Sequence, residues 1–297
     1  MECFELVPRG PFSLRAAAGF GFGPNEGRPP EFDGVLRYAF AVDGGCGYAG
    51  VELRQKGDDQ PVLVTAHGDG DPQTVGGQVA RVLSLDHDGD AFLEVGQRDA
   101  VIGGLQEAHR GVRPVLFFSP YEAAAWSVIS ARQRGIPAAT VRRALCERLG
   151  RSFELEGHRE VAFPGPEELL NATDLDIPGL NGEKQRRLRE VAQAGAEGLL
   201  DASHLQSLGP DGAYLAVQRL RGIGPFYATL IVLRGSGFAD ALLPVAESKV
   251  LAHVAHFYGL AEPPTLERFA AMAELWRPFR TWTTVLLRLA GDRAKDR

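Results

Sequence analysis

The sequence predicts an α+β protein, with an N-terminal antiparallel sheet-plus-helix domain followed by an all-helical region. Short apolar segments between glycine-rich turns fill the first third of the chain, whereas helical apolar spacing dominates the remainder. The 297 residues, 44 % of them hydrophobic and 24 % charged, are typical of a globular protein with a sizeable core. We therefore expect a first domain at residues 1–110 and a helical region at residues 111–297.

Three segments of the first domain have the pattern of β-strands. Leu36–Val42 and Tyr48–Gln55 alternate between apolar and other residues, and Pro61–His67 is a third apolar segment. The glycine-containing turns DGGCG and KGDDQ separate them. A helix is expected at Pro72–Leu85, because valines and Leu83 recur there on one helical face. These elements predict an antiparallel sheet with one or two helices.

The helical region has a recognisable start. Ser119 and Glu122 form an S-x-x-E capping-box pattern, and Pro120 occupies the first helical position. Helical spacing continues through YEAAAWSVISARQR. Further helices are expected at residues 138–149, 166–170, 182–194, 212–219, 225–235, 248–258, 265–276 and 279–289.

Several protein classes are excluded by the composition. Cys3, Cys46 and Cys146 show no metal-ligand spacing, and so few cysteines fit a reducing cytosol rather than a disulfide scaffold or a Cys-ligated cluster. No apolar run is long enough to span a membrane, and the N-terminus lacks the apolar segment of a secretory signal. His253 and His256 lack a matching carboxylate or cysteine, so no metal site is expected.

The charge is unevenly distributed. The formal net charge is −6, but residues 1–110 carry −8 and residues 111–297 carry +2. The basic residues gather in two groups: Arg132, Arg134, Arg142, Arg143, Arg148 and Arg151, and then Lys184, Arg186, Arg187 and Arg189. Local basic patches, rather than the net charge, decide whether a phosphate backbone is attracted. A solvated helix face is the alternative interpretation of either group.

The segment LRGIGPFYATLIVLRGSG, at residues 220–237, predicts two helices joined by the turn Gly222-Ile223-Gly224. Glycines allow a positive φ and a close approach to another chain. The next helix starts at Pro225, so its free N–H groups and positive dipole end lie at the turn. Such a turn binds phosphate without reading base sequence, with Ile223 anchoring it in the core. A plain tight turn between helices is the alternative.

In this context the chain resembles the helix-hairpin-helix DNA glycosylases, specifically the 3-methyladenine DNA glycosylase II family. Five segments in the family's order carry the resemblance: RPVLFFSPYEAAAWSVIS, LNGEKQRRLREVA, LRGIGPFYATLIVLRGSG, ADALLPVAESKVLAHVAHFYGL and LWRPFRTWTTVLLRLA. The resemblance implies that residues 1–110 are the family's small sheet-plus-helix domain. It also implies that the remainder forms two helical subdomains that flank a cleft.

The sequence departs from the family where the catalytic carboxylate is expected. The family has a proline, two variable residues and an aspartate, whereas this chain has Pro244-Val245-Ala246-Glu247. Glu247 therefore extends its carboxylate about 1.5 Å further, and a misplacement of about 1 Å can cost roughly 100-fold in rate. Arg132 or Gln133 aligns with the residue that fills the gap left by a flipped base. Ala131 stands where the family has Gln, and Ala290 where a relative has an aromatic.

The resemblance implies a site for a flipped, damaged base. Electron-rich rings favour a cationic alkylated purine, and the candidates are Phe226, Tyr227, Trp126 and Trp282. Glu247 would stabilise the oxocarbenium character at C1′. Core packing is the alternative for each aromatic residue, and a favourable helix-dipole contact is the alternative for Glu247.

The expected function is monofunctional excision of alkylated purines of the 3-methyladenine type, as a step of base excision repair. Gly222, Ile223 and Gly224 would form the phosphate-binding hairpin, and Lys249 would contact phosphate or be solvated. No lysine follows the hairpin glycines to form a Schiff base, so no lyase step is expected.

The expected partner is double-stranded DNA with alkylated bases. The family implies a monomer without a cofactor, in the bacterial cytoplasm at the nucleoid, although the family hairpin often holds a monovalent cation. The alternative is a glycosylase-like protein that binds damaged DNA with little hydrolysis, favoured by Glu247 in place of aspartate. A function without nucleic acid requires that the arginine groups lie away from the hairpin.

Overall fold

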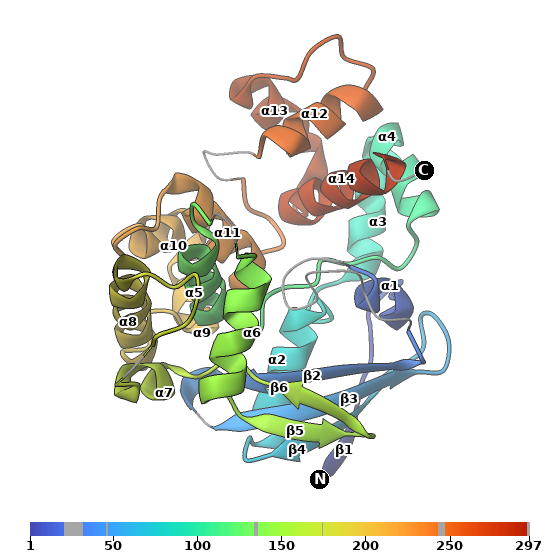
Figure 1. The fold of residues 1–297 in the computed structure, drawn as a ribbon. Coiled ribbons are helices and arrows are strands. Elements are labelled where there is room, and N and C mark those ends of the chain that lie inside the picture. The colour runs from blue at the N-terminus through green and yellow to red at the C-terminus, as the bar shows by residue number, and fades with distance from the viewer. Residues whose placement is uncertain (21–31, 46, 134–135, 174, 243–246, 296–297) are drawn as a thin grey trace.

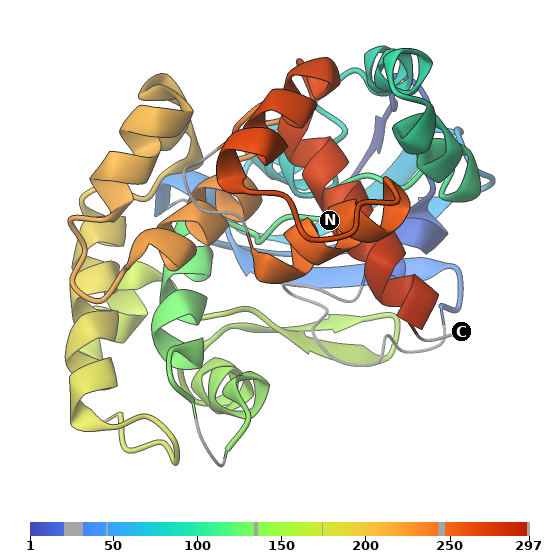
Figure 2. The same cartoon turned by 90° about the horizontal axis from the view of Figure 1, so that it is seen from above.

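The computed structural model describes residues 1–20, 32–45, 47–133, 136–173, 175–242 and 247–295. A four-stranded sheet lies at the bottom of Figure 1, and two groups of helices rise from it. The view from above in Figure 2 shows the two groups side by side. No helix within the described segments is long and apolar enough to cross a membrane.

The sheet is antiparallel throughout, with strand order β1-β4-β3-β2. Its strands are β1 (Glu2–Leu6), β2 (Val35–Ala41), β3 (Tyr48–Gln55) and β4 (Val62–Gly68). The three predicted strands are confirmed to within one residue at each end. β1 was not predicted; it is an edge strand with mostly exposed side chains, so its sequence carries a weak apolar signal.

Helix α2 (Pro72–Val82) packs its valines onto this sheet. It begins where the Asp71 carboxylate accepts a hydrogen bond from the N–H of Thr74, and it ends three residues before the predicted end. Val75, Val79 and Val82 are each 1 % exposed, which confirms the predicted buried face.

Three short helices of the first 110 residues were not predicted individually: α1 (Leu14–Ala18), α3 (Gly89–Arg98) and α4 (Ala100–Ala108). Phe92 of α3 and Ile102 of α4 belong to the same buried core as Trp276 and Leu287 near the C-terminus. Residues 89–108 therefore pack with the last helices, although they precede the expected domain boundary.

The helical region consists mainly of the following helices: α5 (Pro120–Ser130), α6 (Ala138–Leu149), α7 (Pro166–Asn171), α8 (Gly182–Ala196), α9 (Ala202–Ser207), α10 (Gly209–Val217), α11 (Pro225–Gly235), α12 (Ser248–Phe257), α13 (Leu266–Ala273) and α14 (Arg280–Lys295). Together with the sheet they confirm the α+β fold class. The predicted bounds of α6 and α11 are confirmed to the residue.

A short hairpin interrupts this region, so the expectation that it is purely helical needs correction. Its strands are β5 (Ser152–Leu155) and β6 (His158–Val161). The two turn residues, Glu156 and Gly157, both have positive φ, at 48° and 76°, as two-residue hairpin turns of the primed type require. Phe153 lies against Gly50 of β3, where an added Cβ would come within 2.7 Å of its ring. The hairpin therefore extends the sheet domain.

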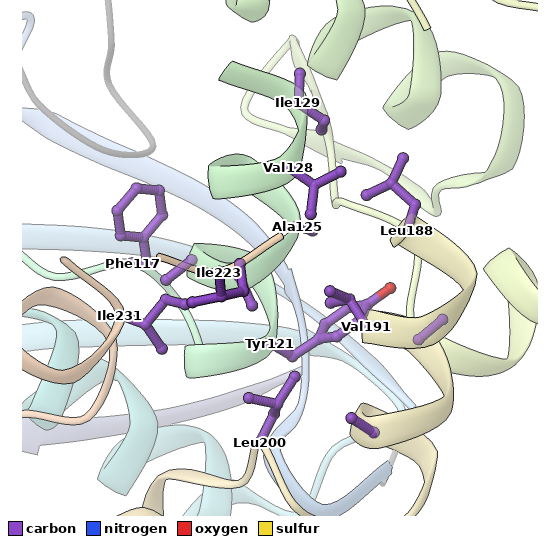
Figure 3. Close-up of a cluster of buried hydrophobic side chains, with 14 of the residues drawn as sticks. Phe117, Tyr121, Ala125, Val128, Ile129, Leu188, Val191, Leu200, Ile223 and Ile231 are labelled. Carbon is purple, nitrogen blue, oxygen red and sulfur yellow. The ribbon is translucent and has the colours of Figure 1, made fainter. Parts of the chain in front are cut away.

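The two groups of helices have separate buried cores. Helices α5–α11 enclose the first, of which Figure 3 shows Phe117, Tyr121, Leu188 and Ile223. The second contains α3, α4 and α12–α14 and centres on the fully buried Trp276. The chain passes from the first group to the second between α11 and α12.

A buried arginine fixes the start of that connection. Arg81 of α2 donates hydrogen bonds to the carbonyl of Gly235 at 2.9 Å and of Phe118 at 2.8 Å, and it pairs with Asp43 at 2.7 Å. Gln206 donates to the carbonyl of Ser236 at 2.7 Å. The C-terminal end of α11 is thus held against both the sheet domain and α9.

Candidate active site

The predicted hairpin is present between α10 and α11. Gly222 has a φ of +89°, in the left-handed region that favours glycine, whereas Gly224 has an ordinary φ of −84°. Ile223 is 5 % exposed and joins the first helical core, and its N–H donates to the carbonyl of Leu220 at 3.1 Å. The turn is therefore anchored from inside, as expected, while Gly222 remains on the surface.

The N-terminus of α11 presents backbone donors at this turn. Gly224 is the N-cap residue, and its carbonyl accepts the N–H of Ala228 at 2.9 Å. The N–H groups of Phe226 and Tyr227 precede that bond, where helical geometry provides no acceptor, and Pro225 has no N–H. The dipole of the 11-residue helix adds a partial positive charge. The hairpin can therefore bind an anion through its backbone.

The second basic group lies beside the hairpin. A Cβ added to Gly222 would lie 2.8 Å from Nη1 of Arg187, so this guanidinium rests directly on the turn. Arg187 donates from Nε to Glu183 at 3.0 Å, and Arg186 also pairs with Glu183. The hydrogen bond from Arg186 and the positive charges nearby lower the pKa of the Glu183 carboxyl. Arg221 is exposed on the turn itself.

Three arginines of the first basic group contact other parts of the protein. Arg142 pairs with the buried Glu122, Arg148 donates to the carbonyl of Asp176 at 3.2 Å, and Arg151 pairs with Asp69 at 3.5 Å. These three arginines are used within the protein. Arg134 lies outside the described residues.

The two alternatives for the residue that fills the gap in the duplex behave differently. Gln133 donates to the carbonyl of Ile136 at 2.8 Å and accepts a hydrogen bond from Lys184, so its side chain is held by the protein. Arg132 is exposed and has a φ of +48°, which an arginine rarely adopts. The structure thus leaves Arg132 accessible at the end of α5.

The four predicted aromatic residues are not brought together. Phe226 is 50 % exposed and meets the ring of Tyr227 edge-on at 5.3 Å, and the Tyr227 hydroxyl accepts a hydrogen bond from Ser130 at 3.4 Å. Trp126 is partly buried against the first core. Trp282 is 3 % exposed within the second core, as the core-packing alternative expects. Phe226 is therefore the candidate with a face open to solvent.

Glu247 is the N-cap residue of α12, and its side chain is 36 % exposed. Its carboxylate accepts a hydrogen bond from Nε of Arg288 at 3.0 Å. Burial and, after it, the positive charge of Arg288 lower the pKa of the Arg234 guanidinium to about 9, while the carboxylate of Glu247 opposes the shift. Pro244, Val245 and Ala246 lie outside the described residues, and Lys249 is exposed.

Sequence reasoning missed Arg288 as the partner of the candidate carboxylate, and Asp292 as the second partner of Arg288. They lie four residues apart on α14 and form an ion pair, so they share one helical face. The signal in the sequence is two opposite charges at this spacing in the otherwise apolar run VLLRLAGD.

A separate cavity lies between α3, α4 and α14. Its lining includes Phe92, Gln106, Arg113, Trp282 and Leu286. Neither Glu247 nor the hairpin borders it. Within the described segments, no cluster of three or more His, Cys, Asp or Glu residues could hold a metal ion.

Comparisons with known proteins bear on the fold and the family. No protein-family model matches the chain. It is 23 % identical over 207 residues to a DNA-3-methyladenine glycosylase of Bacillus subtilis (strain 168), covering 69 % of this chain and 68 % of that protein.

Two solved structures have the same fold over almost their whole length. A 3-methyladenine DNA-glycosylase from Archaeoglobus fulgidus superposes with a TM-score of 0.76, at 19 % identity and 98 % coverage of both chains. An 8-oxoguanine glycosylase/lyase of Clostridium acetobutylicum, in complex with double-stranded DNA, has a TM-score of 0.67, at 17 % identity and 99 % coverage of both. The resemblance to the helix-hairpin-helix DNA glycosylases is thereby confirmed.

Proposed function

We propose that this protein is a DNA glycosylase that hydrolyses the N-glycosidic bond of alkylated purines, of the 3-methyladenine type, without a lyase step. One observation carries the proposal. The partly exposed carboxylate of Glu247 lies at the start of α12, the next helix after α11, where the resembled family has its aspartate. The named Bacillus relative supports the same reaction class.

Binding to the duplex would start at the hairpin. The N–H groups at the start of α11 and the guanidinium of Arg187 lie together on this turn and suit a backbone phosphate. Lys249 and Arg221 are further exposed cations on the elements that flank the site. These contacts read no base sequence, which an enzyme that searches DNA for rare damage requires.

A base must leave the stack before its glycosidic bond can be reached. Arg132, exposed at the end of α5, is suited to occupy the vacated space in the duplex. Phe226 offers a half-exposed ring on which an electron-poor alkylated base can stack, with Tyr227 edge-on behind it. Trp126 and Trp282 would contribute to the pocket indirectly, through packing.

The chemical step would need one negative charge near C1′. As the bond to the purine breaks, the sugar gains oxocarbenium character, which an ionised Glu247 stabilises electrostatically. The base leaves with the bonding electron pair, water adds to C1′, and the proton that this water loses passes to the solvent. The alkyl group makes the purine a good leaving group, so no strong acid is required on the protein.

The proposal includes no Schiff-base route, because no lysine directly follows the hairpin glycines. Pro225, Phe226 and Tyr227 follow the hairpin glycines, and none is a lysine. The Lys184 ammonium is bound to the carbonyl of Ile129 and to Gln133. Lys249 is exposed two residues after Glu247, so it is the lysine to test for borohydride trapping on DNA.

A second candidate function is recognition of damaged DNA with little hydrolysis. The observation that favours it is the ion pair of Glu247 with Arg288, which offsets part of the charge that the reaction uses. Under either function we propose a monomer that acts on double-stranded DNA in the bacterial cytoplasm, with residues 1–110 supporting the helical region.

The test is to identify the bases that the protein releases from methylated duplex DNA. We expect 3-methyladenine or 7-methylguanine from the native protein, none from Glu247→Gln, and no borohydride-trapped adduct. Binding to DNA with an abasic-site analogue is measured alongside, and both proteins should bind it. If neither protein releases a base although both bind the analogue, the damage-recognition function replaces the enzymatic one.

A further inference from the structure

The Glu247 carboxylate is not restrained by its own helix. The backbone carbonyl of Glu247 accepts the N–H groups of Val250 at 2.9 Å and of Leu251 at 3.3 Å, so its backbone is fixed. Its side chain, however, makes no capping hydrogen bond to α12. A glutamate also has one more rotatable bond than an aspartate. The position of the carboxylate must therefore be set by a neighbouring element.

Arg288 of α14 supplies that restraint. Its Nε donates to Oε2 of Glu247 at 3.0 Å, while its Nη1 forms an ion pair with Asp292, one turn further along the same helix. Anions on two sides hold the planar guanidinium in one orientation. The arginine side chain is 24 % exposed, so the pair is partly shielded from water.

Asp292 is in turn held by α12. Nε2 of His253, a residue 2 % exposed, lies 3.4 Å from Oδ1 of Asp292. Gly291 makes room for the imidazole, because an added Cβ would come within 2.2 Å of the ring. The contacts therefore run from Glu247 at the start of α12 to α14 and back to the middle of α12.

We propose that Arg288 is a positioning residue for Glu247, and that Asp292 keeps its guanidinium in the required orientation. The proposal rests on the proposed function and adds that the longer glutamate works because α14 holds it. Arg288 engages Oε2, so the proposal assigns the other oxygen, Oε1, to the sugar. The two helices that carry these residues pack through Val250, Val254 and Leu287, which keeps the distance between them fixed.

The first test compares Arg288→Met, Arg288→Lys and Asp292→Asn in single-turnover base release at saturating protein. We expect Arg288→Met to lose about 10- to 100-fold in rate, as for a misplaced catalytic group. Arg288→Lys should lose less of the rate, because it keeps the positive charge but not the planar guanidinium that bonds two carboxylates. Asp292→Asn should lose about 3- to 10-fold in rate. Binding to abasic-analogue DNA should change by less than about 3-fold, which separates positioning from phosphate contact.

Arg37→Met is the matched control. Arg37 is also largely buried and pairs with two carboxylates, Asp33 and Glu156, but it lies on β2. We expect Arg37→Met to release base at a rate within about 2-fold of that of the native protein. Two results would overturn the positioning proposal: base release by Arg288→Met at the native rate, or a loss of rate matched by an equal loss of affinity for abasic-analogue DNA.

A double-mutant cycle separates this inference from the proposed function. Glu247→Gln, Arg288→Met and the double variant are compared in thermal unfolding and in base release. Because the two residues act as a unit, the double variant should release base as slowly as Glu247→Gln alone, and the unfolding effects should be non-additive. Additive effects in both would overturn the positioning proposal alone. A native protein that releases no base, with coupling still present in unfolding, would overturn the proposed function.

Discussion

The hairpin and the carboxylate site are built in opposite ways. The hairpin is a local backbone structure: Gly222 has a positive φ, Ile223 anchors the turn, and the helix begins at once. The carboxylate site depends on side chains from two helices, because Glu247 is held by Arg288, 41 positions later in the chain. A backbone site tolerates many surrounding sequences, whereas a side-chain site can change with single substitutions.

The largest expected effect on stability comes from a substitution in the second helical core. Trp282→Ala removes a side chain that is 3 % exposed and packs against Phe92 and Phe279. We expect the free energy of unfolding to fall by about 3–5 kcal/mol, as measured by denaturant titration. The matched variant Phe226→Ala, at a half-exposed ring, should cost less than about 1 kcal/mol. Equal costs would mean that Trp282 does not carry this core.

The two hairpin glycines, Gly222 and Gly224, should differ in how much their substitution by alanine weakens DNA binding. Gly222→Ala forces a Cβ into a position with a φ of +89° and 2.8 Å from Arg187, so we expect about a 10-fold or greater loss of affinity for undamaged and abasic-analogue DNA alike. Gly224→Ala meets no atom within 4 Å and has an ordinary φ, so its affinity should remain nearly native. If both variants bind equally in a titration of labelled duplex, the hairpin is not the phosphate site.

Phe226 tests whether base stacking occurs at the hairpin side of the site. Removing the exposed ring in Phe226→Ala should weaken binding to DNA with a flipped base analogue by about 1–3 kcal/mol. Binding to an undamaged duplex should change little, since its bases stay stacked. A loss that is equal for the two DNAs would assign Phe226 to general backbone contact.

The smallest expected effect is an increase in affinity. Glu183 pairs with Arg186 and Arg187 beside the hairpin, so it competes with a phosphate for both guanidiniums. We expect Glu183→Gln to tighten DNA binding by about 2- to 5-fold at low salt and less at high salt, because exposed charges are screened. Weaker binding by this variant would mean that Glu183 orients Arg187 rather than neutralising it.

Local signals in the sequence were sufficient for much of the fold. The capping residue Ser119 and the proline at Pro225 mark helix starts that the structure reproduces, and the alternating segment Tyr48–Gln55 is a strand with the predicted bounds. The strands that escaped prediction are short. β1 is an edge strand that pairs with the distant β4, and β5–β6 is a short local hairpin whose Phe153 packs against Gly50 of the sheet, so neither is marked by its own periodicity.

In the candidate site, too, the local features could be predicted from the sequence and the long-range contacts could not. The hairpin could be predicted, because Gly222, Ile223 and the following helix are adjacent in the chain. The contact of Glu247 with Arg288 could not, because it depends on how α12 packs against α14. The choice between Arg132 and Gln133 also required the structure, since it depends on the hydrogen bonds of Gln133 with residues of other segments.

The most direct test of the central claim is the single-turnover release of 3-methyladenine from duplex DNA by the native protein and by Glu247→Gln. The substitution keeps the shape of the side chain and removes its charge. We predict that release falls by at least about 100-fold while binding to abasic-analogue DNA stays within about 3-fold, because the charge acts mainly in the transition state. Release at the native rate by Glu247→Gln would contradict the assignment of Glu247 as the working carboxylate.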